Sequence, residues 1–99
     1  DYMDKEFTKA DLRDGMVVEQ RDGDMYLVLA EEVVRKCGYN EMNCYTDDLK
    51  CKGYTEGDIV KVYRITPESL RRIEDVFIKS NLELIWERKE PKKMTVEEM

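Results

Sequence analysis

The fold is decided by residues 16–30, which read MVVEQRDGDMYLVLA. Two runs rich in Val, Leu and Tyr, residues 16–20 and 25–30, flank a short polar segment that holds Asp22-Gly23. Asp-Gly between two such runs is typical of a β-hairpin, because glycine tolerates the positive φ that a tight turn needs. We therefore predict two antiparallel strands over these residues.

Two more strands are predicted further along the chain. Residues 58–65, DIVKVYRI, carry apolar side chains on both faces, which is typical of a central strand. Residues 82–88, LELIWER, alternate, with Leu82, Leu84 and Trp86 expected on one face. Residues 31–36 are expected to continue the strand before them. The polar segment 37–57 should hold a short strand or turn near residues 42–45 and a turn at 47–49.

Helical structure is predicted after two capping signals. Thr8 and Asp11 have the spacing of a capped turn, so residues 9–13 should form one short helical turn. Thr66-Pro67-Glu68 combines a capping hydroxyl, a proline at the first helical position and an acid, which favours a longer helix. Its expected core-facing stripe is Leu70, Ile73, Val76 and Phe77, with Arg71, Arg72, Glu74 and Asp75 turned outward.

This order of elements predicts a mainly β (α+β) fold with one helix. We expect a small, strongly bent antiparallel sheet that closes into an SH3-like barrel, because a parallel sheet would need helices between most of its strands. Ninety-nine residues suffice for a single domain of this kind. Residues 1–99 are therefore predicted to form one unit, with residues 1–6 and 91–99 as flexible ends.

Composition excludes most enzyme classes. The chain holds 17 Lys and Arg, 23 Asp and Glu and no His, which gives a net charge of −6. Without His, the chain has no Ser-His-Asp or Cys-His catalytic site and no His-based zinc site. The aspartates Asp22, Asp24, Asp47 and Asp48 lack the ligand spacing of a calcium loop. We therefore predict a non-enzymatic protein with no catalytic residue, metal or cofactor.

The three cysteines, Cys37, Cys44 and Cys51, are an odd number at a regular spacing of seven. An odd number argues against a closed set of disulfides, and no close Cys pair is present to bind zinc. We interpret them as reduced thiols of a cytoplasmic protein, with a surface metal or redox role as the alternative. No apolar run approaches the length of about 18 residues that spans a bilayer.

The order of several structural motifs resembles a known group of proteins. These motifs are Asp11-Leu12 with Gly15–Glu19, the Asp-Gly hairpin before Tyr26–Val28, Asp48-Leu49, Asp58–Tyr63, and Ile85–Arg88 with Lys92–Val96. Together they cover most of the chain and resemble small uncharacterised proteins encoded by phages and prophages of Gram-positive bacteria. The resemblance implies a phage-linked origin and the cytoplasm of a bacterial host as the location. It implies no activity and no site.

Charge is divided unevenly along the chain, which suggests protein recognition. Residues 1–58 hold 8 basic and 15 acidic residues, or −7, whereas residues 59–99 hold 9 and 8, or +1. An acidic surface steers a protein toward a basic partner, and large aromatic side chains are favoured in interfaces. The predicted partner is a protein, with a basic nucleic-acid-binding host or defence protein as the specific hypothesis. The candidate contact residues are Tyr39, Met42, Tyr45, Asp47, Asp48 and Tyr54. The alternative is that these aromatic side chains fill the open end of the barrel and that the acidic residues only keep the chain soluble.

The alternative function is a nucleic-acid-associated domain that uses the more basic C-terminal half. Its candidate contacts are Lys61, Arg88, Lys92 and Lys93, with Tyr63 and Trp86 as rings on which bases could stack. The net negative charge disfavours this function, because phosphate-binding surfaces are normally far more positive. Tyr63 and Trp86 fit better as core residues.

Overall fold

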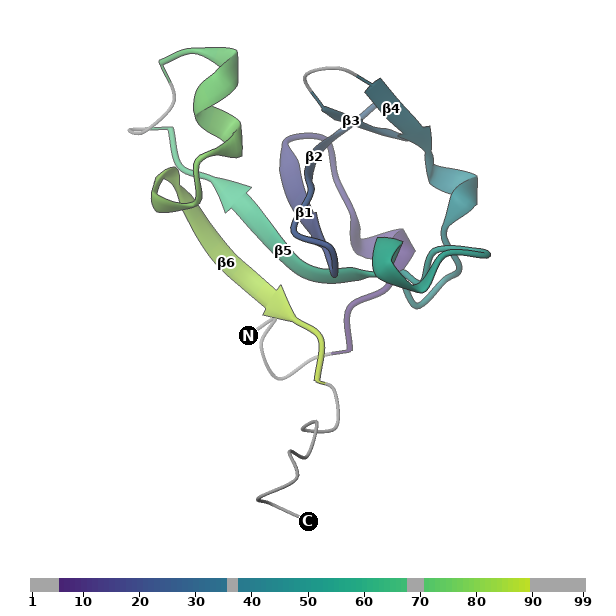
Figure 1. The fold of residues 1–99 in the computed structure, drawn as a ribbon. Coiled ribbons are helices and arrows are strands. Elements are labelled where there is room, and N and C mark those ends of the chain that lie inside the picture. Colours follow the sequence, from purple (N-terminus) through teal and green to yellow (C-terminus); the bar gives the residue numbers. More distant parts are fainter. Residues whose placement is uncertain (1–5, 36–37, 68–70, 90–99) are drawn as a thin grey trace, which may run out of the picture.

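The computed structural model describes residues 6–35, 38–67 and 71–89. These residues form a six-stranded antiparallel sheet with the strand order β4-β3-β2-β1-β5-β6 (Figure 1). The strands are β1 (Met16–Gln20), β2 (Met25–Leu29), β3 (Glu32–Arg35), β4 (Gly38–Glu41), β5 (Ile59–Ile65) and β6 (Leu82–Glu87). The helical elements are short 3-10 turns, namely η2 (Lys9–Asp11), η3 (Met42–Cys44), η4 (Thr55–Gly57), η5 (Ile73–Phe77) and η6 (Lys79–Asn81).

The prediction of a mainly β antiparallel fold is confirmed, and the prediction of one helix is wrong. Between Pro67 and β6 the described chain holds only the 3-10 turns η5 and η6, and residues 68–70, which include Glu68 of the start signal and Leu70 of the expected stripe, lie outside the described residues. Within the described residues β4 and β6 are open edges and do not pair, so closure into a barrel is not confirmed. The expected flexible ends lie outside the described residues apart from Glu6.

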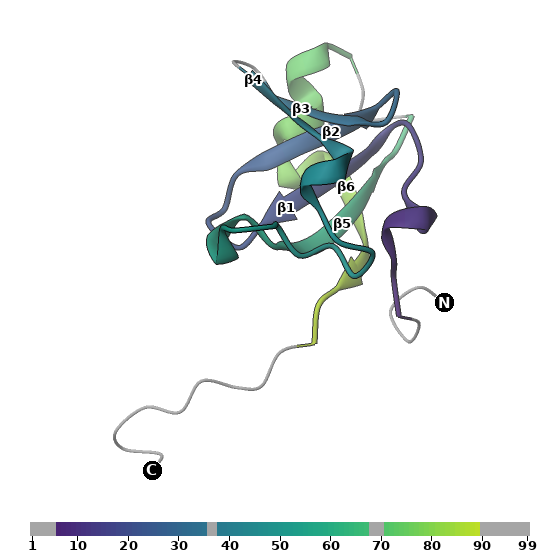
Figure 2. The same cartoon turned by 90° about the vertical axis from the view of Figure 1, so that its right-hand side faces the viewer.

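The sheet is covered on both faces. One core cluster lies under the N-terminal segment and the chain between β4 and β5, and it contains Phe7, Leu12, Val18, Tyr26, Val28, Val33, Tyr45, Leu49, Ile59, Val62, Ile85 and Trp86. The other lies under η5 and contains Val17, Leu27, Tyr63 and Val76. Figure 2 shows η2 and η5 well apart around the sheet. Val17 and Val18, both fully buried, therefore belong to opposite faces, as expected of a central strand.

The chain turns back after β2 instead of continuing as one strand. Ala30 and Glu31 have φ values of 50° and 67°, and β3 then pairs antiparallel with β2. Neither residue is the Gly or Asn that usually marks such a turn, so the sequence carried no turn signal here. The strand predicted over residues 31–36 exists in part as β3, but its continuity with β2 was wrong.

A bulge changes the faces of β6. The β5–β6 register shifts between Val62 and Tyr63, so that Val62 lies opposite Trp86 and Tyr63 opposite Leu84. Ile85 and Trp86 are consequently both buried, while Leu84 remains 36% exposed. The predicted alternation of Leu82, Leu84 and Trp86 on one face was therefore wrong, because a bulge adds a residue without pairing it.

The polar segment, which the sequence analysis placed at residues 37–57, contains more regular secondary structure than its composition indicated. It begins with β4, which the sequence did not predict, and continues into η3 at the turn expected near residues 42–45. The turn at 47–49 is confirmed by the hydrogen bond of 2.9 Å from the Leu49 amide to the Thr46 carbonyl. The short helical turn near residue 9 is also confirmed, as η2.

Candidate functional site

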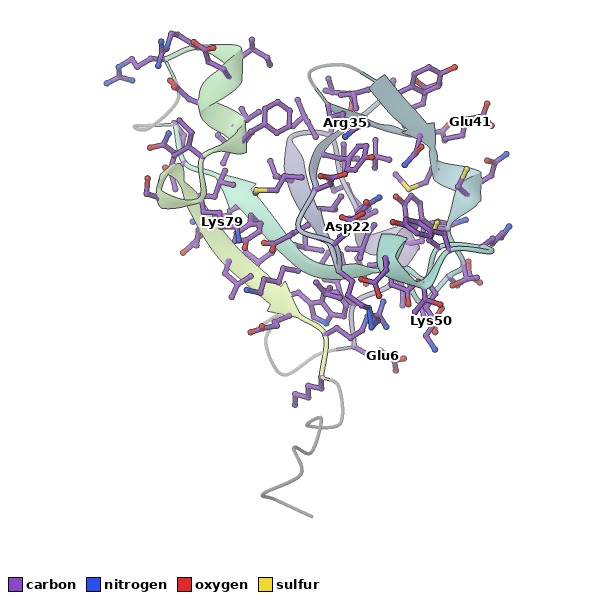
Figure 3. All side chains as sticks on the ribbon, viewed as in Figure 1. Glu6, Asp22, Arg35, Glu41, Lys50 and Lys79 are labelled. Atoms are coloured by element: carbon purple, nitrogen blue, oxygen red, sulfur yellow. The ribbon has the colours of Figure 1, made fainter. Side chains whose placement is uncertain are left out.

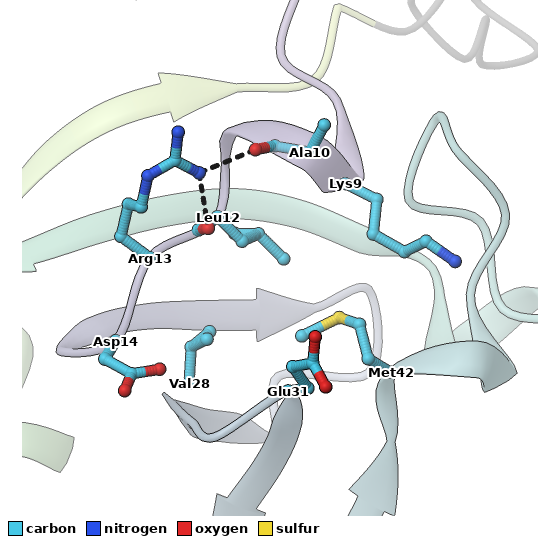
Figure 4. A pocket seen from close by; sticks show the side chains of 8 residues that line it. All are labelled: Lys9, Ala10, Leu12, Arg13, Asp14, Val28, Glu31 and Met42. Carbon is cyan, nitrogen blue, oxygen red and sulfur yellow. Dashed lines mark hydrogen bonds between the residues drawn. The ribbon is translucent and has the colours of Figure 1, made fainter.

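A groove lies between η2, the β2–β3 turn and η3. It consists of a hollow of about 620 Å³ and an adjoining one of about 480 Å³, which share Lys9, Glu31 and Met42. Leu12, Val28 and Met42 supply its apolar lining, and Figure 4 shows Leu12 and Val28 between Arg13 and Glu31, with Met42 beside Glu31. A concave surface with an apolar floor and charged walls is typical of binding sites.

The cations beside the groove are already held by backbone oxygens. The Asp11 carboxylate accepts hydrogen bonds from the Thr8 amide at 2.9 Å and the Thr8 hydroxyl at 3.1 Å, which fixes η2. The Lys9 ammonium then donates to the Tyr45 carbonyl at 2.9 Å. The Arg13 guanidinium donates to the carbonyls of Ala10 at 2.6 Å and Leu12 at 2.9 Å (Figure 4). These contacts occupy hydrogen-bond donors of the two basic side chains and fix them beside the groove.

The opposite wall is built on the β2–β3 turn. The Asp14 carboxylate accepts a hydrogen bond of 3.0 Å from the Ala30 amide, and the Met42 amide donates to the Glu31 carbonyl at 3.3 Å. These bonds hold Ala30 and Glu31 in the left-handed region, where a residue with a Cβ is strained by about 1 kcal/mol or more. Left-handed residues other than glycine are often found at binding sites, and this pair holds Glu31 beside Met42.

Three carboxylates form an acidic rim on this wall, namely Glu31, Glu32 and Glu41. Glu32 and Glu41 lie directly opposite each other on β3 and β4, and all three side chains are exposed. Figure 3 shows Glu41 at the outer end of β4, far from Lys79. Within the described residues, no Lys or Arg forms an ion pair with any of the three. Like charges opposite each other destabilise a sheet, so the fold gains nothing from this pair.

One of the predicted contact residues, Met42, lines this groove. Tyr39, which is 60% exposed, is not among the lining residues but lies two residues before Glu41 and therefore on the same face of β4. The sequence reasoning missed the other lining residues, including those of the acidic rim. Only the Glu31-Glu32 doublet was visible in the sequence, and its proximity to Glu41 depends on the pairing of β3 with β4.

Tyr45 is not a surface contact. It is fully buried, and its hydroxyl accepts a hydrogen bond of 2.8 Å from the Gln20 side-chain amide. Asp47 and Asp48 are exposed on the following turn. The Asp48 carboxylate is hydrogen-bonded by the Thr46 hydroxyl, which lowers the pKa of Asp48. The structure therefore does not place all the predicted residues on one surface.

Tyr54 belongs to a second acidic surface. Its side chain is 55% exposed beside η4, where the Asp22 amide donates to the Glu56 carbonyl at 3.0 Å. The pKa of Tyr54 is raised first by partial desolvation and then by the carboxylates of Asp22, Glu56 and Asp24. This surface carries charge and an aromatic ring, but neither hollow of the groove includes it.

The residues proposed for nucleic-acid contact do not form an exposed aromatic face. Tyr63 and Trp86 are 6% and 7% exposed, so neither ring is available for stacking. Lys61 lies 3.8 Å from the Glu87 carboxylate. The Arg88 guanidinium donates to the carbonyls of Ile59 at 3.1 Å and Asp48 at 2.6 Å. Lys92 and Lys93 lie outside the described residues.

The cysteines and carboxylates outside the groove offer no assembled metal site. Cys44 is exposed and Cys51 half-buried, and both are free thiols, whereas Cys37 lies outside the described residues. Burial raises the pKa of Cys51 and so lowers its thiolate fraction. Over the described residues, no group of three or more Cys, Asp and Glu could hold a metal ion.

Comparisons with models of protein families, with curated proteins and with solved structures found no match for this chain. The resemblance to phage and prophage proteins therefore stays a prediction. In the part of the chain that the structure describes, no helix is long and apolar enough to cross a membrane.

Proposed function

We propose that the protein is a non-enzymatic binding module that recognises a basic segment of a partner protein in the groove between η2 and η3. The observation that carries the proposal is the pair Glu32 and Glu41, which face each other across β3 and β4 beside an apolar floor. A Lys or Arg of the partner would neutralise this repulsion, and an adjacent apolar side chain would cover Met42.

The open edge of β4 supports an extended partner segment. The Met42 amide donates a hydrogen bond to the Glu31 carbonyl, next to β3. Backbone groups alternate in direction along an antiparallel strand, so the amide and carbonyl of Asn40 also point toward β3, whereas those of Tyr39 and Glu41 point away from the sheet. An extended chain could pair with these outward groups, as in strand addition to a sheet edge. It would then run beside the exposed Tyr39 ring and the acidic rim.

The charge of the groove and the phage-like motif order together suggest the class of partner. A basic protein that binds nucleic acid in a bacterial cytoplasm presents Lys and Arg that normally contact phosphate. Carboxylates of the acidic rim would occupy these cations, and the module would act as an inhibitor by competing with nucleic acid.

The experiment compares two charge-matched double variants in capture from a bacterial lysate, followed by mass spectrometry. The variant Glu32→Lys with Glu41→Lys should lose the basic proteins that the unchanged chain captures. The variant Asp47→Lys with Asp48→Lys changes the charge equally on a different exposed turn and should retain them. Circular dichroism checks that both variants fold.

A defined probe makes the same test quantitative. Binding of a labelled peptide of alternating Lys and Leu, followed by fluorescence anisotropy, should weaken about tenfold or more in Glu32→Lys with Glu41→Lys, because loss of close charge pairs in an interface typically costs over 1.4 kcal/mol. Equal binding by both double variants would contradict the proposal. The alternative, a nucleic-acid-associated domain, has less support because Tyr63 and Trp86 are buried.

A further inference from the structure

Two rows of side chains run across the sheet and end at the free edge of β4. The first, which we call the apolar row, consists of residues that lie directly opposite one another on β2, β3 and β4, namely Leu27, Val34 and Tyr39. The second, the acidic row, lies beside it on the same face and consists of Leu29, Glu32 and Glu41. Figure 1 shows β4 at the outer edge of the sheet, so a strand added there would extend both rows.

The apolar row is exposed where it reaches this edge. Leu27 is buried and Val34 is half-buried, whereas the Tyr39 ring is 60% exposed. An exposed tyrosine at a sheet edge contributes little to the core, and tyrosine is enriched in surfaces that bind another chain.

The acidic row keeps its negative charge in the folded chain. Glu32 and Glu41 form no ion pair with a Lys or Arg of the described residues. Arg35, the basic residue of β3, lies 3.3 Å from the Asp24 carboxylate instead. Among the described residues that line the adjoining hollow, Lys9 is the single cation, and it is outnumbered by the three carboxylates of the acidic rim.

The backbone of β4 favours an antiparallel segment. The amides and carbonyls of Tyr39 and Glu41 point away from the sheet, so each of these residues can exchange two hydrogen bonds with one residue of an antiparallel segment. All of these bonds fall between Tyr39 and Glu41. A parallel segment needs residues level with Gly38 and Met42 for the same number of bonds, and β4 ends at Glu41, where η3 begins.

An antiparallel segment meets the acidic row before the apolar row. Its residue opposite Glu41 comes first, and its residue opposite Tyr39 follows two positions later on the same face. The residue between them points to the other face of the sheet, which carries Asn40. Charge complementarity therefore favours Lys or Arg at the first position, and the Tyr39 ring favours an aromatic side chain at the third.

We propose that the partner segment carries Lys or Arg, then any residue, then an aromatic residue, and that it adds to β4 as an antiparallel strand. Tyr39 determines the specificity at the third position. This inference rests on the proposed function and adds to it the direction of the segment and the role of Tyr39. A second copy of β4 does not fit the edge as well, because its residues Gly38–Glu41 offer no cation to the acidic row.

Two labelled peptides of equal composition test the order of the side chains. One carries Lys-Thr-Phe and the other Phe-Thr-Lys, each flanked by Ser, and the full chain is titrated into both with fluorescence anisotropy as the readout. The Lys-Thr-Phe peptide should bind about fivefold tighter, because in an antiparallel segment only this order places Phe against Tyr39 and Lys against Glu41 together.

Methylation of single peptide nitrogens tests the direction. In the antiparallel arrangement the Lys and Phe amides donate to the carbonyls of Glu41 and Tyr39, whereas the Thr amide points away from β4. N-methylation of Lys or Phe should therefore weaken binding about tenfold, because it removes a hydrogen bond and separates the strands, and N-methylation of Thr should leave binding unchanged. A parallel segment requires the opposite result, because its middle amide donates to the Tyr39 carbonyl.

Substitution of Tyr39 tests its role in specificity. Tyr39→Ser should abolish the preference of the chain for Lys-Thr-Phe over Lys-Thr-Ser. Tyr54→Ser, at a tyrosine that is 55% exposed beside η4, is the matched control and should leave this preference unchanged. Circular dichroism checks that both variants fold.

Four results would overturn the inference. They are equal binding of the two orders, loss of binding on N-methylation of Thr, equal effects of Tyr39→Ser and Tyr54→Ser, and a Tyr39-dependent dimer in analytical ultracentrifugation that the peptide does not dissociate. In each case, lost binding of the Lys-Thr-Phe peptide by Glu32→Lys with Glu41→Lys would leave the proposed function in place and reject only the pattern and direction. Undiminished binding by that double variant would reject the proposed function itself.

Discussion

Single buried polar side chains connect distant parts of this chain. The Tyr45 hydroxyl joins the segment after β4 to Gln20 at the end of β1. The Glu19 carboxylate, which is 7% exposed, accepts hydrogen bonds from the Tyr63 hydroxyl at 2.6 Å and the Lys79 ammonium at 3.1 Å. Buried polar groups are almost always paired in this way, because an unpaired one keeps its full desolvation penalty.

Tyr45→Phe should lower the free energy of unfolding by about 1–2 kcal/mol, because it removes the hydroxyl and leaves the buried Gln20 amide without this acceptor. Urea unfolding followed by circular dichroism measures the change. Tyr54→Phe is the matched control at an exposed site and should change stability by less than about 0.5 kcal/mol. Equal losses in both variants would show that the Gln20 contact contributes nothing specific.

At the scale of elements, the two hairpin turns differ in their chemistry. Gly23 has a φ of 93° and suits the β1–β2 turn, whereas Ala30 and Glu31 take positive φ with a Cβ attached. The first turn was therefore predictable from the sequence, and the second was not. The second turn also supplies Glu31 to the groove, which gives a reason for tolerating its strain.

Glu31→Gly should raise the free energy of unfolding by about 1 kcal/mol, because glycine adopts this φ without strain. The same change should weaken binding of the Lys-Leu peptide, because it removes one carboxylate of the acidic rim. Gly23→Ala is the opposite control and should destabilise by about 1 kcal/mol. A loss of stability in Glu31→Gly would argue against strain at this turn.

The carboxylate of Asp75 organises η5. Backbone hydrogen bonding from Arg72 and then Arg71 lowers the pKa of Asp75, so its contribution to stability is present above the ordinary pKa of 3.8 and is lost as the pH falls below it. The sequence predicted a helix with Asp75 outward. Local hydrogen bonds to Asp75 instead accompany a short 3-10 turn in which this residue is buried. The periodicity of apolar residues could not reveal these bonds.

Asp75→Asn should loosen η5 without unfolding the sheet. Hydrogen exchange of the Ile78 amide, which donates to the Asp75 carbonyl at 3.2 Å, should become faster, while amides paired between β1 and β5 keep their protection. Glu74→Gln, at the exposed neighbour that forms an ion pair with Arg72, should leave the exchange of Ile78 unchanged. Faster exchange throughout the sheet would instead assign Asp75 a global role.

At the scale of the whole molecule, buried tyrosines make the fold sensitive to alkali. Burial raises the pKa of Tyr26, Tyr45 and Tyr63 above the ordinary 10.0, and in Tyr63 the hydrogen bond to Glu19 acts in the same direction. The folded state thus keeps these hydroxyls protonated at a pH where the unfolded chain ionises them. The stabilisation is complete below pH 10 and is lost as the pH rises above it.

We therefore expect cooperative unfolding above pH 10, in which tyrosinate absorbance and loss of the β-sheet circular dichroism rise together. Tyr39 is 60% exposed, so Tyr39→Phe should leave the transition in place. Titration of all six tyrosines near pH 10 with an unchanged sheet would contradict the expectation.

The acidic rim is also a property of the whole molecule. It brings together Glu31 of the β2–β3 turn, Glu32 of β3 and Glu41 of β4. The split of −7 and +1 along the sequence indicated an acidic surface in the first half of the chain. It did not reveal which carboxylates lie together, because Glu32 meets Glu41 only through the pairing of β3 with β4.

The sequence by itself determined the β1–β2 hairpin, the central strand β5, the strand β6 and the capped turn η2, because each depends on local turn chemistry or on alternation within a few residues. It also determined that Tyr63 and Trp86 fit the core. Only the tertiary structure decided the bulge in β6, the 3-10 form of η5 and the opposition of Glu32 and Glu41. The bulge and the opposition of the two glutamates depend on strand register, and the form of η5 depends on the hydrogen bonds that the Asp75 carboxylate accepts from Arg71 and Arg72, neither of which a one-dimensional pattern contains.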